Sequence, residues 1–154
     1  MPGKPNQTYR RPALVERLFS RVFGLLVRLG LGLPHNYLLQ VRGRKTGRTY
    51  STPVDVLKFR GNRYLVAPRG QTQWVRNAQA AGEIRLIKAW SHRRYRLRSI
   101  PDAQKPQILK AYLDRFALTV QRYFPVRAGS PVEAFAPLTA DYPAFELLPP
   151  DQQA

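Results

Sequence analysis

Near the N-terminus, the apolar residues recur with the spacing of an amphipathic α-helix. Arginines and a glutamate occupy the other positions, so the segment is too charged for a transmembrane helix. We expect a flexible tail over residues 1–10 and a helix over residues 11–33 that packs on the core. A basic amphipathic helix lying on a membrane surface is the alternative. The apolar face consists of Leu14, Leu18, Val22, Leu25 and Leu29.

Beyond residue 34 the pattern changes to short alternating segments, which are typical of antiparallel β-strands. In one of them, three arginines alternate with Tyr95 and Leu97, which predicts a basic exposed face and an apolar buried face. Gly61 and Asn62 predict a two-residue hairpin turn of type II′, because glycine prefers the first central position of that turn. The predicted strands cover Tyr37–Val41, Tyr50–Phe59, Arg63–Ala67, Ile84–Lys88, Arg93–Ile100 and Ala144–Leu148.

Helical patterns interrupt and follow these strands. A helix over Gln71–Ala81, ended by Gly82, is predicted with Trp74, Ala78 and Ala81 on one side.

A longer helix is predicted over Asp102–Tyr123, and a short one follows, with Ser130 as N-cap and Glu133 in the first turn. Strands in antiparallel hairpins with helices around them predict the α+β class, and a small barrel hides their edges. We expect a single domain, with the barrel over residues 34–149 and a tail over residues 150–154.

The charge balance predicts an anionic partner. The chain of 154 residues has 26 Lys and Arg against 9 Asp and Glu, a formal net charge of +17. Nucleic acid, an anionic membrane and a polyanionic small molecule all fit this charge, and a solvated arginine-rich surface explains it without a partner. The nucleic-acid alternative would use Arg85, Lys88, Trp90, Arg93, Arg94, Tyr95, Arg96 and Arg98, although no RRM, KH or helix-turn-helix motif accompanies them.

Residues for hydrolytic or metal chemistry are scarce. His35 and His92 are the only histidines and lack metal-ligand spacing, so no metal site is expected. The absence of cysteine excludes disulfides and a cysteine nucleophile and fits a reducing cytosol. No GxSxG motif supports a serine hydrolase. An enzyme with these residues would depend on a cofactor for its chemistry.

The segment Gly43–Arg48 is the best candidate for a binding site. Two glycines bracket adjacent cations and a hydroxyl, a combination that favours backbone and side-chain contacts to an anion. The spacing does not match a P-loop, and a surface hairpin turn is the plain alternative.

This segment and those that follow it resemble the deazaflavin-dependent nitroreductase family, split-β-barrel proteins related to FMN-binding oxidoreductases. The similarity covers about 40 residues, from Leu39 to Asn77, and extends weakly to the strand near Phe145. The matching motifs are Gly43-Arg44-Lys45-Thr46-Gly47, Ser51-Thr52-Pro53, Tyr64-Leu65-Val66-Ala67-Pro68, Gly70 and Trp74-Val75-Arg76-Asn77.

The resemblance implies a split β-barrel that binds coenzyme F420, with FMN as the alternative. It also implies hydride transfer to a small hydrophobic quinone or nitro acceptor and a homodimer. The lack of cysteine predicts a cytoplasmic location, and the basic N-terminal helix predicts a peripheral place on the inner face of the cell membrane as the alternative. A non-catalytic carrier of a flavin or lipid-type ligand is the other alternative. The cofactor-binding positions it implies are Arg44, Lys45, Thr46, Tyr50, Ser51, Thr52, Pro53, Val54, Asp55, Val66, Ala67, Pro68, Arg69, Trp74, Val75, Arg76 and Asn77.

Tyr50, Tyr112 and Tyr123 are candidates to supply or relay a proton, with packing at the core edge as the alternative role for each. The chain also departs from the family pattern. The usual glycine- and lysine-containing insertion before Trp74 is shortened to Pro68–Gln73, so part of the family's phosphate site is missing.

Overall fold

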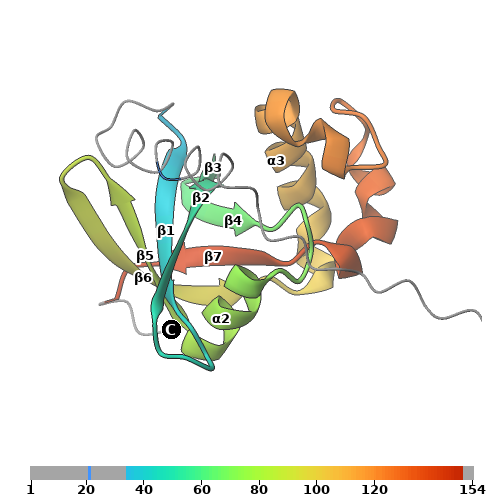
Figure 1. Ribbon diagram of the computed structural model, residues 1–154. Helices are drawn as coiled ribbons and strands as arrows, with labels where there is room; N and C mark the ends of the chain where they lie inside the picture. Colours follow the sequence, from blue (N-terminus) through green and yellow to red (C-terminus); the bar gives the residue numbers. More distant parts are fainter. Residues whose placement is uncertain (1–20, 22–33, 151–154) are drawn as a thin grey trace, which may run out of the picture.

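The computed structural model describes residue 21 and residues 34–150, and it is built on one antiparallel sheet of seven strands (Figure 1). The predicted helix over residues 11–33 and the tail over residues 1–10 lie outside the described residues. The order of the strands in the sheet is β2-β1-β5-β6-β7-β4-β3. The strands are β1 (Asn36–Arg42), β2 (Thr49–Asp55), β3 (Leu57–Phe59), β4 (Asn62–Val66), β5 (Glu83–Lys88), β6 (Ser91–Ser99) and β7 (Ala144–Leu148).

The connection between the two edge strands forces the sheet to curl. β2 and β3 lie at opposite edges, yet Val56 alone separates them in the chain. In a flat sheet, six spacings of about 4.8 Å would hold these edges about 29 Å apart, far beyond the reach of one residue. The sheet therefore forms a half-barrel, and the backbone N–H of Val56 donates a hydrogen bond to the carbonyl of His35 at its rim.

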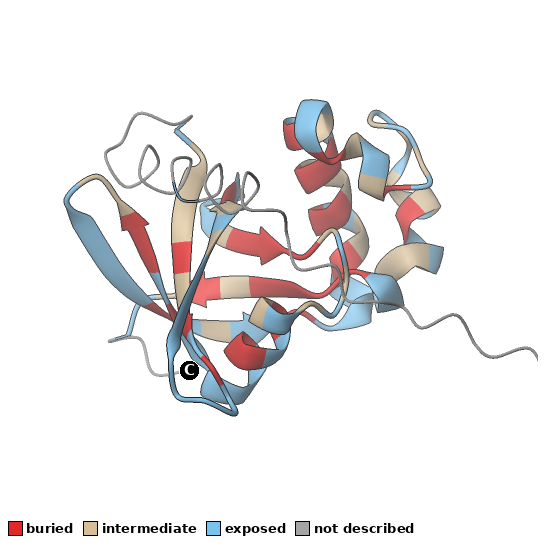
Figure 2. Cartoon of the chain, viewed as in Figure 1, coloured by how far each residue is buried: buried red, intermediate tan, exposed pale blue. Residues whose placement is uncertain are grey.

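Two apolar clusters hold the fold together. One fills the concave side of the half-barrel and includes Leu39, Leu65 and Phe145, which are almost completely buried. The other lies between β3, β4 and the helices after β6, with Leu113 and Phe135 at its centre. Buried positions on the strands and on the side of α3 that faces them are visible in Figure 2. The α+β class and the barrel-like sheet are confirmed.

Between residues 34 and 150, two α-helices, α2 (Gln73–Ala81) and α3 (Lys105–Val120), accompany three 3₁₀ segments. The helix predicted over Asp102–Tyr123 is present as the run η1 (Asp102–Gln104), α3 and η2 (Gln121–Tyr123), and it kinks at Phe116. The third 3₁₀ segment is η3 (Val132–Asp141).

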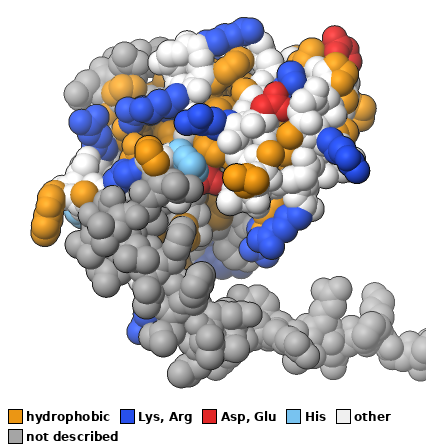
Figure 3. Space-filling model, turned by 90° about the horizontal axis from the view of Figure 1, so that it is seen from above, with side chains coloured by type: hydrophobic (Ala, Val, Ile, Leu, Met, Phe, Trp, Pro, Cys, Tyr) orange, Lys and Arg blue, Asp and Glu red, His pale blue; other side chains and the backbone are white. Residues whose placement is uncertain are grey.

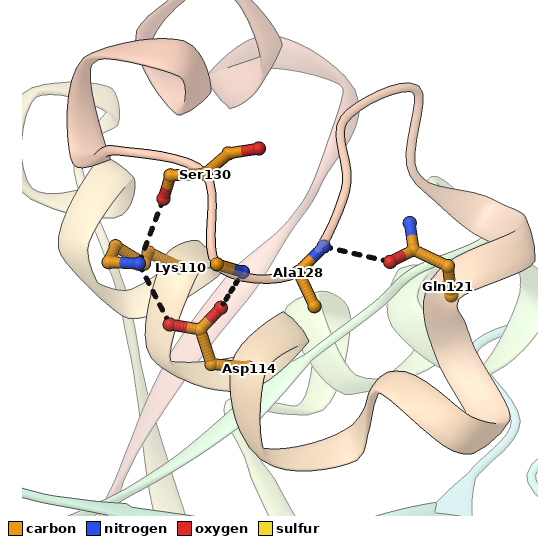
Figure 4. Close-up of polar contacts among 6 residues, drawn as sticks. Lys110, Asp114, Gln121, Ala128 and Ser130 are labelled. Carbon is orange, nitrogen blue, oxygen red and sulfur yellow. Dashed lines mark hydrogen bonds and ion pairs between the residues drawn. The ribbon is translucent and has the colours of Figure 1, made fainter.

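The loop between η2 and η3 is tied to the preceding helix by side-chain hydrogen bonds (Figure 4). Lys110 Nζ donates to the carbonyl of Ser130 at 2.8 Å and pairs with Asp114 at 2.9 Å. The N–H of Gly129 donates to Asp114 Oδ1 at 2.7 Å, and Gln121 Oε1 accepts the N–H of Ala128 at 2.8 Å. These bonds satisfy backbone groups of an irregular segment and fix η3 against α3.

Four local predictions are wrong. The strand predicted over Tyr50–Phe59 is two strands, because the chain changes edge at Val56. The turn after β3 uses Arg60 and Gly61, which both have positive φ (49° and 81°), so it is a type I′ turn and not a II′ turn.

The other two errors concern helices. Ser130 caps no helix, because η3 begins after Pro131 and lacks a side-chain cap. Ala81 is exposed, and the buried side of α2 carries Val75, Asn77 and Ala78.

Candidate functional site

A pocket of about 440 Å³ opens where the loop between β1 and β2 meets the N-terminus of α2. Its volume is in the range that holds small molecules and cofactors. Its lining comes from the end of β1, the glycine loop, the first half of β2 and the first turn of α2. The lining residues are Val41, Gly43, Arg44, Lys45, Thr46, Tyr50, Ser51, Thr52, Thr72, Gln73, Trp74 and Asn77.

Gly43 is required because the ring of Tyr50 lies against it. A Cβ at this position would be 2.5 Å from Tyr50 Cε2 and 2.8 Å from Thr46 Oγ1, so any side chain here would force these two exposed side chains to shift. The Thr46 and Tyr50 hydroxyls lie 3.1 Å apart, within hydrogen-bond distance. The N–H of Gly43 also donates to the carbonyl of Arg48 at 2.7 Å and closes the loop. The glycine therefore allows one wall of the pocket to pack tightly.

Arg44 is held in place by α2. Its backbone N–H donates to Asn77 Oδ1 at 3.1 Å, and its Nη1 donates to the same oxygen at 2.7 Å. A third bond runs from Nη1 to Gln73 Oε1 at 3.0 Å. Asn77 is only 6% exposed, so this buried oxygen fixes both the loop and the guanidinium. The charge of Arg44 is thus oriented before any ligand arrives.

The first turn of α2 adds a partial positive charge to the pocket. A helix N-terminus presents unpaired N–H groups, and no acidic residue in this first turn neutralises them. Thr72 occupies the N-cap position without a side-chain cap bond. Its Oγ1 is the one buried side-chain polar atom without a hydrogen-bond partner among the described residues. Such an atom beside two cations fits a ligand with phosphate or carboxylate oxygens.

The structure brings eight of the predicted cofactor positions together and leaves nine out of this pocket. Val66, Ala67 and Val75 are buried in the apolar clusters, while Arg69 and Arg76 are exposed elsewhere. Pro53, Val54, Asp55 and Pro68 are outside the lining as well, and the first three continue along β2 away from it. The eight that line it are Arg44, Lys45, Thr46, Tyr50, Ser51, Thr52, Trp74 and Asn77.

Of the three candidate tyrosines, only Tyr50 lines the pocket, and it is 45% exposed. Tyr112 is buried in the cluster beneath α3, where burial and then the charge of Asp55 raise its pKa above the ordinary range. Tyr123 lies on η2, and its backbone carbonyl accepts a hydrogen bond from the hydroxyl of Tyr142. Tyr112 therefore stays protonated at neutral pH.

Sequence reasoning missed two features of the site. Thr72 and Gln73 line the pocket, and the N-cap preference for threonine before Trp74 was the signal that pointed to them. A pair between His35 Nε2 and Asp55 Oδ1, 3.6 Å apart, forms at the far end of β2. Burial raises the pKa of Asp55, and His35 offsets part of that rise. Strand register joins these two residues, and no local motif indicates it.

Residue 21 and residues 34–150 contain neither a metal-ion site nor a membrane-spanning helix. No group of three or more His, Cys, Asp or Glu side chains in this part of the chain is arranged to hold a metal ion. No helix in the same part is both long enough and apolar enough to cross a bilayer.

The curled antiparallel sheet and the pocket beside its glycine loop define the split-β-barrel class of flavin-type binding domains. Residues 15–127 match the family F420H(2)-dependent quinone reductase, and the chain belongs to this family. The family resemblance inferred from the Gly43–Gly47 motif is thereby confirmed. No curated protein sequence matches the chain significantly.

Solved structures support the same fold. The heme storage protein HutZ from Vibrio cholerae superposes with a TM-score of 0.53 at 10% identity, over 78% of this chain and 83% of that one. A chain described as a domain-swapped dimer gives a TM-score of 0.51 at 13% identity, over 86% and 96%. A 5-nitroimidazole antibiotic resistance protein from Bacteroides thetaiotaomicron gives 0.50 at 11%, over 83% and 80%.

Proposed function

We propose that this protein is an oxidoreductase that binds coenzyme F420 in the pocket beside the glycine loop and reduces a quinone- or nitro-type acceptor. The observation that carries the proposal is that Arg44, Lys45, the N-terminus of α2 and the unpaired Thr72 Oγ1 all belong to the lining of one pocket. The cofactor carries a phosphate and a carboxylate tail, and both groups need positive charge and free hydrogen-bond donors. Membership of the family supports this choice over FMN.

The residues divide the binding task between them. Arg44, already oriented by Asn77, would hold the phosphate with the backbone N–H groups of α2. Lys45 would pair with the tail carboxylates. Trp74 and Val41 offer an apolar surface at the same pocket. When bound, the reduced deazaflavin supplies the hydride that the protein's own side chains cannot.

Tyr50, Ser51 and Thr52 would offer the first half of β2 to the cofactor, because these three residues line the pocket. Tyr50 would therefore be the side chain placed to supply or relay a proton. Asp55 and its partner His35 lie further along β2, outside the lining, and would take part in proton transfer only with an acceptor that extends beyond the pocket.

The experiment that tests the proposal is a fluorescence titration of the full chain with F420, with FMN in parallel. We expect saturable binding of F420 and weaker or no binding of FMN. Lys45→Ala should weaken F420 binding by about tenfold, the usual effect of losing one charge-assisted hydrogen bond. Its fold should be unaffected because Lys45 is exposed.

Arg96→Ala is the matched control, because Arg96 is exposed on β6 and does not line the pocket. It removes the same charge without touching the site, so its F420 affinity should stay within about twofold of wild type. Equal losses in the two variants would mean that only the general basic charge attracts the cofactor. No binding of F420 at all would overturn the proposal. If F420 binds, reduction of menadione by F420H2 tests the reaction itself.

A further inference from the structure

A group of basic side chains converges at the other end of the half-barrel. Side chains alternate across a strand, so those that share parity with the core cluster point into the barrel. Arg63 shares parity with Leu65 on β4, and Arg93 shares parity with Tyr95 on β6. We call this group the basic mouth; its cations are Lys58, Arg63, Lys88 and Arg93, from β3, β4, β5 and β6.

The basic mouth is well separated from the pocket beside the glycine loop. Tyr37, near the start of β1, lines a cavity of about 260 Å³ at the mouth, whereas Val41 near the end of β1 lines the glycine-loop pocket. Tyr37 and Val41 are four residues apart on one strand, which is a distance of about 13 Å. The apolar core fills the space between the two cavities. The two sites therefore do not share a wall.

Two of the basic groups are fixed by neighbouring groups. Arg63 Nη1 donates to the hydroxyl of Tyr95 at 3.0 Å, and Tyr95 is only 7% exposed. Lys88 Nζ donates to the carbonyl of Pro34 at 2.5 Å and lies 4.8 Å above the ring centre of Tyr37. Lys58 is paired directly with Arg63 across β3 and β4. The positive charges are held near one another by these contacts despite their repulsion.

Two cavities meet at these side chains. The cavity of about 260 Å³ also contacts Leu86 and Ser91, and among the described residues no acidic side chain lines it. A second cavity of about 470 Å³ lies next to it, and its lining includes Glu146, which pairs with Arg98. Both cavities are lined by Arg63, Arg93 and Tyr95. The shared wall places two guanidinium-bearing residues where a ligand in either cavity would meet them.

The alternative is that these cations belong to a general basic surface. Two of the three outward-facing arginines of β6 are paired with carboxylates, since Arg94 pairs with Glu83 at 2.9 Å and Arg98 pairs with Glu146 at 2.5 Å. Arg63, Arg93 and the outward-facing Arg96 form no ion pair with a carboxylate of the described residues. Arg63 and Arg93 differ from Arg96 because both line the two cavities. In Figure 3, Lys and Arg side chains gather over the strands beside apolar side chains, while most visible acidic side chains lie toward the helical part.

We propose that the basic mouth is a second anion-binding site, separate from the cofactor pocket, that takes a compact phosphate-bearing group of two or more negative charges. Arg63 and Arg93 provide planar donors suited to phosphate oxygens, and Lys88 adds a point charge. Tyr37 and Tyr95 provide aromatic surface for the part of the ligand attached to the phosphate. The phosphate belongs either to a free small molecule or to a lipid headgroup.

The test is calorimetric titration of the full chain with pyrophosphate at physiological salt. We expect Arg93→Ala to weaken binding by about tenfold, because it removes one charge-assisted contact. Arg93 is exposed, so the variant should fold normally. Lys58→Ala at the same mouth should weaken binding too, and Arg96→Ala, on the outer face of β6, should change it by less than about twofold.

Two further experiments show where pyrophosphate binds and whether the natural phosphate belongs to a lipid headgroup or to a free molecule. Lys45→Ala should leave pyrophosphate binding at the mouth intact, and in this variant the backbone amide shifts of Tyr37 and Ser91 should still change on titration, whether or not Gly43 shifts as well. Co-sedimentation with vesicles of phosphatidylcholine and phosphatidic acid, lost in Arg93→Ala and kept in Arg96→Ala, assigns the phosphate to a lipid. If the protein binds pyrophosphate but does not co-sediment with the vesicles, the phosphate belongs to a free molecule.

Three results would overturn the proposal: neither pyrophosphate nor vesicles bind, Arg93→Ala and Arg96→Ala lose affinity equally, or the amide shifts map only to the glycine loop. Binding of a single-stranded oligonucleotide that depends equally on Arg93 and Arg96, without pyrophosphate binding, would show a general basic surface instead.

Discussion

The two ends of the half-barrel are both basic, but they are constructed differently. At the glycine-loop end, the pocket is lined by two short segments of chain, and neutral groups of α2 hold Arg44 in place. At the other end, each cation of the basic mouth comes from a different strand, and two of them are fixed by aromatic side chains and one carbonyl.

This difference determines how each end responds to change. Side-chain amides and a helix N-terminus hold the glycine-loop pocket, so one lost hydrogen bond loosens the whole loop. Strand backbones hold the basic mouth, so losing one side chain leaves the others in position. We therefore expect substitutions to have cooperative effects at the first end and nearly additive effects at the second.

The largest effect is expected for Gly43→Ala. The new Cβ would overlap the ring of Tyr50 at 2.5 Å and force it out of the pocket wall. We expect F420 binding to weaken by more than about tenfold, because the pocket wall is displaced, and stability to fall by less than about 1 kcal/mol, because the displaced ring is 45% exposed. Fluorescence titration and thermal unfolding measure the two effects.

The Gly43→Ala/Tyr50→Ala double variant, compared with Tyr50→Ala alone, separates the clash from other roles of the glycine. If the glycine acts only through the ring, these two proteins should bind F420 equally. Wild-type affinity in the single Gly43→Ala variant would contradict the described packing.

An intermediate effect is expected for Asn77→Ala. The substitution removes the oxygen that accepts two hydrogen bonds from Arg44 and leaves its backbone N–H without that partner. We expect a loss of about 1–3 kcal/mol in the free energy of unfolding, together with weaker F420 binding.

Gln73→Ala is the control, because it removes only the exposed 3.0 Å bond to Arg44. It should cost less than about 0.5 kcal/mol. Equal losses in both variants, measured by denaturant unfolding, would show that burial of the Asn77 oxygen is irrelevant. Pyrophosphate binding at the basic mouth should be unchanged in both.

The smallest effect is expected at the basic mouth itself. Burial first, and then repulsion from Lys58, lowers the pKa of Lys88. Lys58→Ala removes the repulsion and should raise the pKa of Lys88 toward its ordinary value, with Lys45→Ala as a control that leaves it unchanged.

The lowered pKa of Lys88 also determines how the stability of the protein changes with pH. A lysine with a lowered pKa in the folded state binds its proton less tightly there than in the unfolded chain. The wild-type protein should therefore gain stability as pH rises from the lowered pKa toward 10.5, and Lys58→Ala should gain less. An NMR titration of the lysine side chain checks the pKa, and an unchanged value would place Lys58 too far away to matter.

The sequence predicts most of the elements, because their periodicity is strong. The buried series Ile108, Tyr112, Phe116 and Val120 follows the predicted helical spacing, and the basic and apolar faces around Tyr95 alternate as expected. The two wrong predictions about strands share a cause. Val56 changes edge and Arg60 adopts positive φ because of how strands pair across the sheet, and local residue preferences do not report that pairing.

Because strand pairing cannot be seen in local sequence, the glycine-loop end of the barrel is easier to predict from the sequence than the basic mouth. A glycine loop that is contiguous in the chain can be recognised as a motif, and Arg44, Lys45 and Thr46 do line the pocket. The basic mouth needs the order of four strands before its members meet, and Arg63 gives no local sign of it. The pair His35 and Asp55 was hidden for the same reason.

The place of β7 in the sheet has a consequence for the synthesis of the protein. It pairs with β6 on one side and β4 on the other, yet it follows both in the chain, so Leu65 finds Phe145 only after a long intervening segment has been made. Contacts between such distant residues slow folding. During translation, the nascent chain would carry β4 and β6 as open edges, exposed to pairing with other chains, until residues 144–148 leave the ribosome.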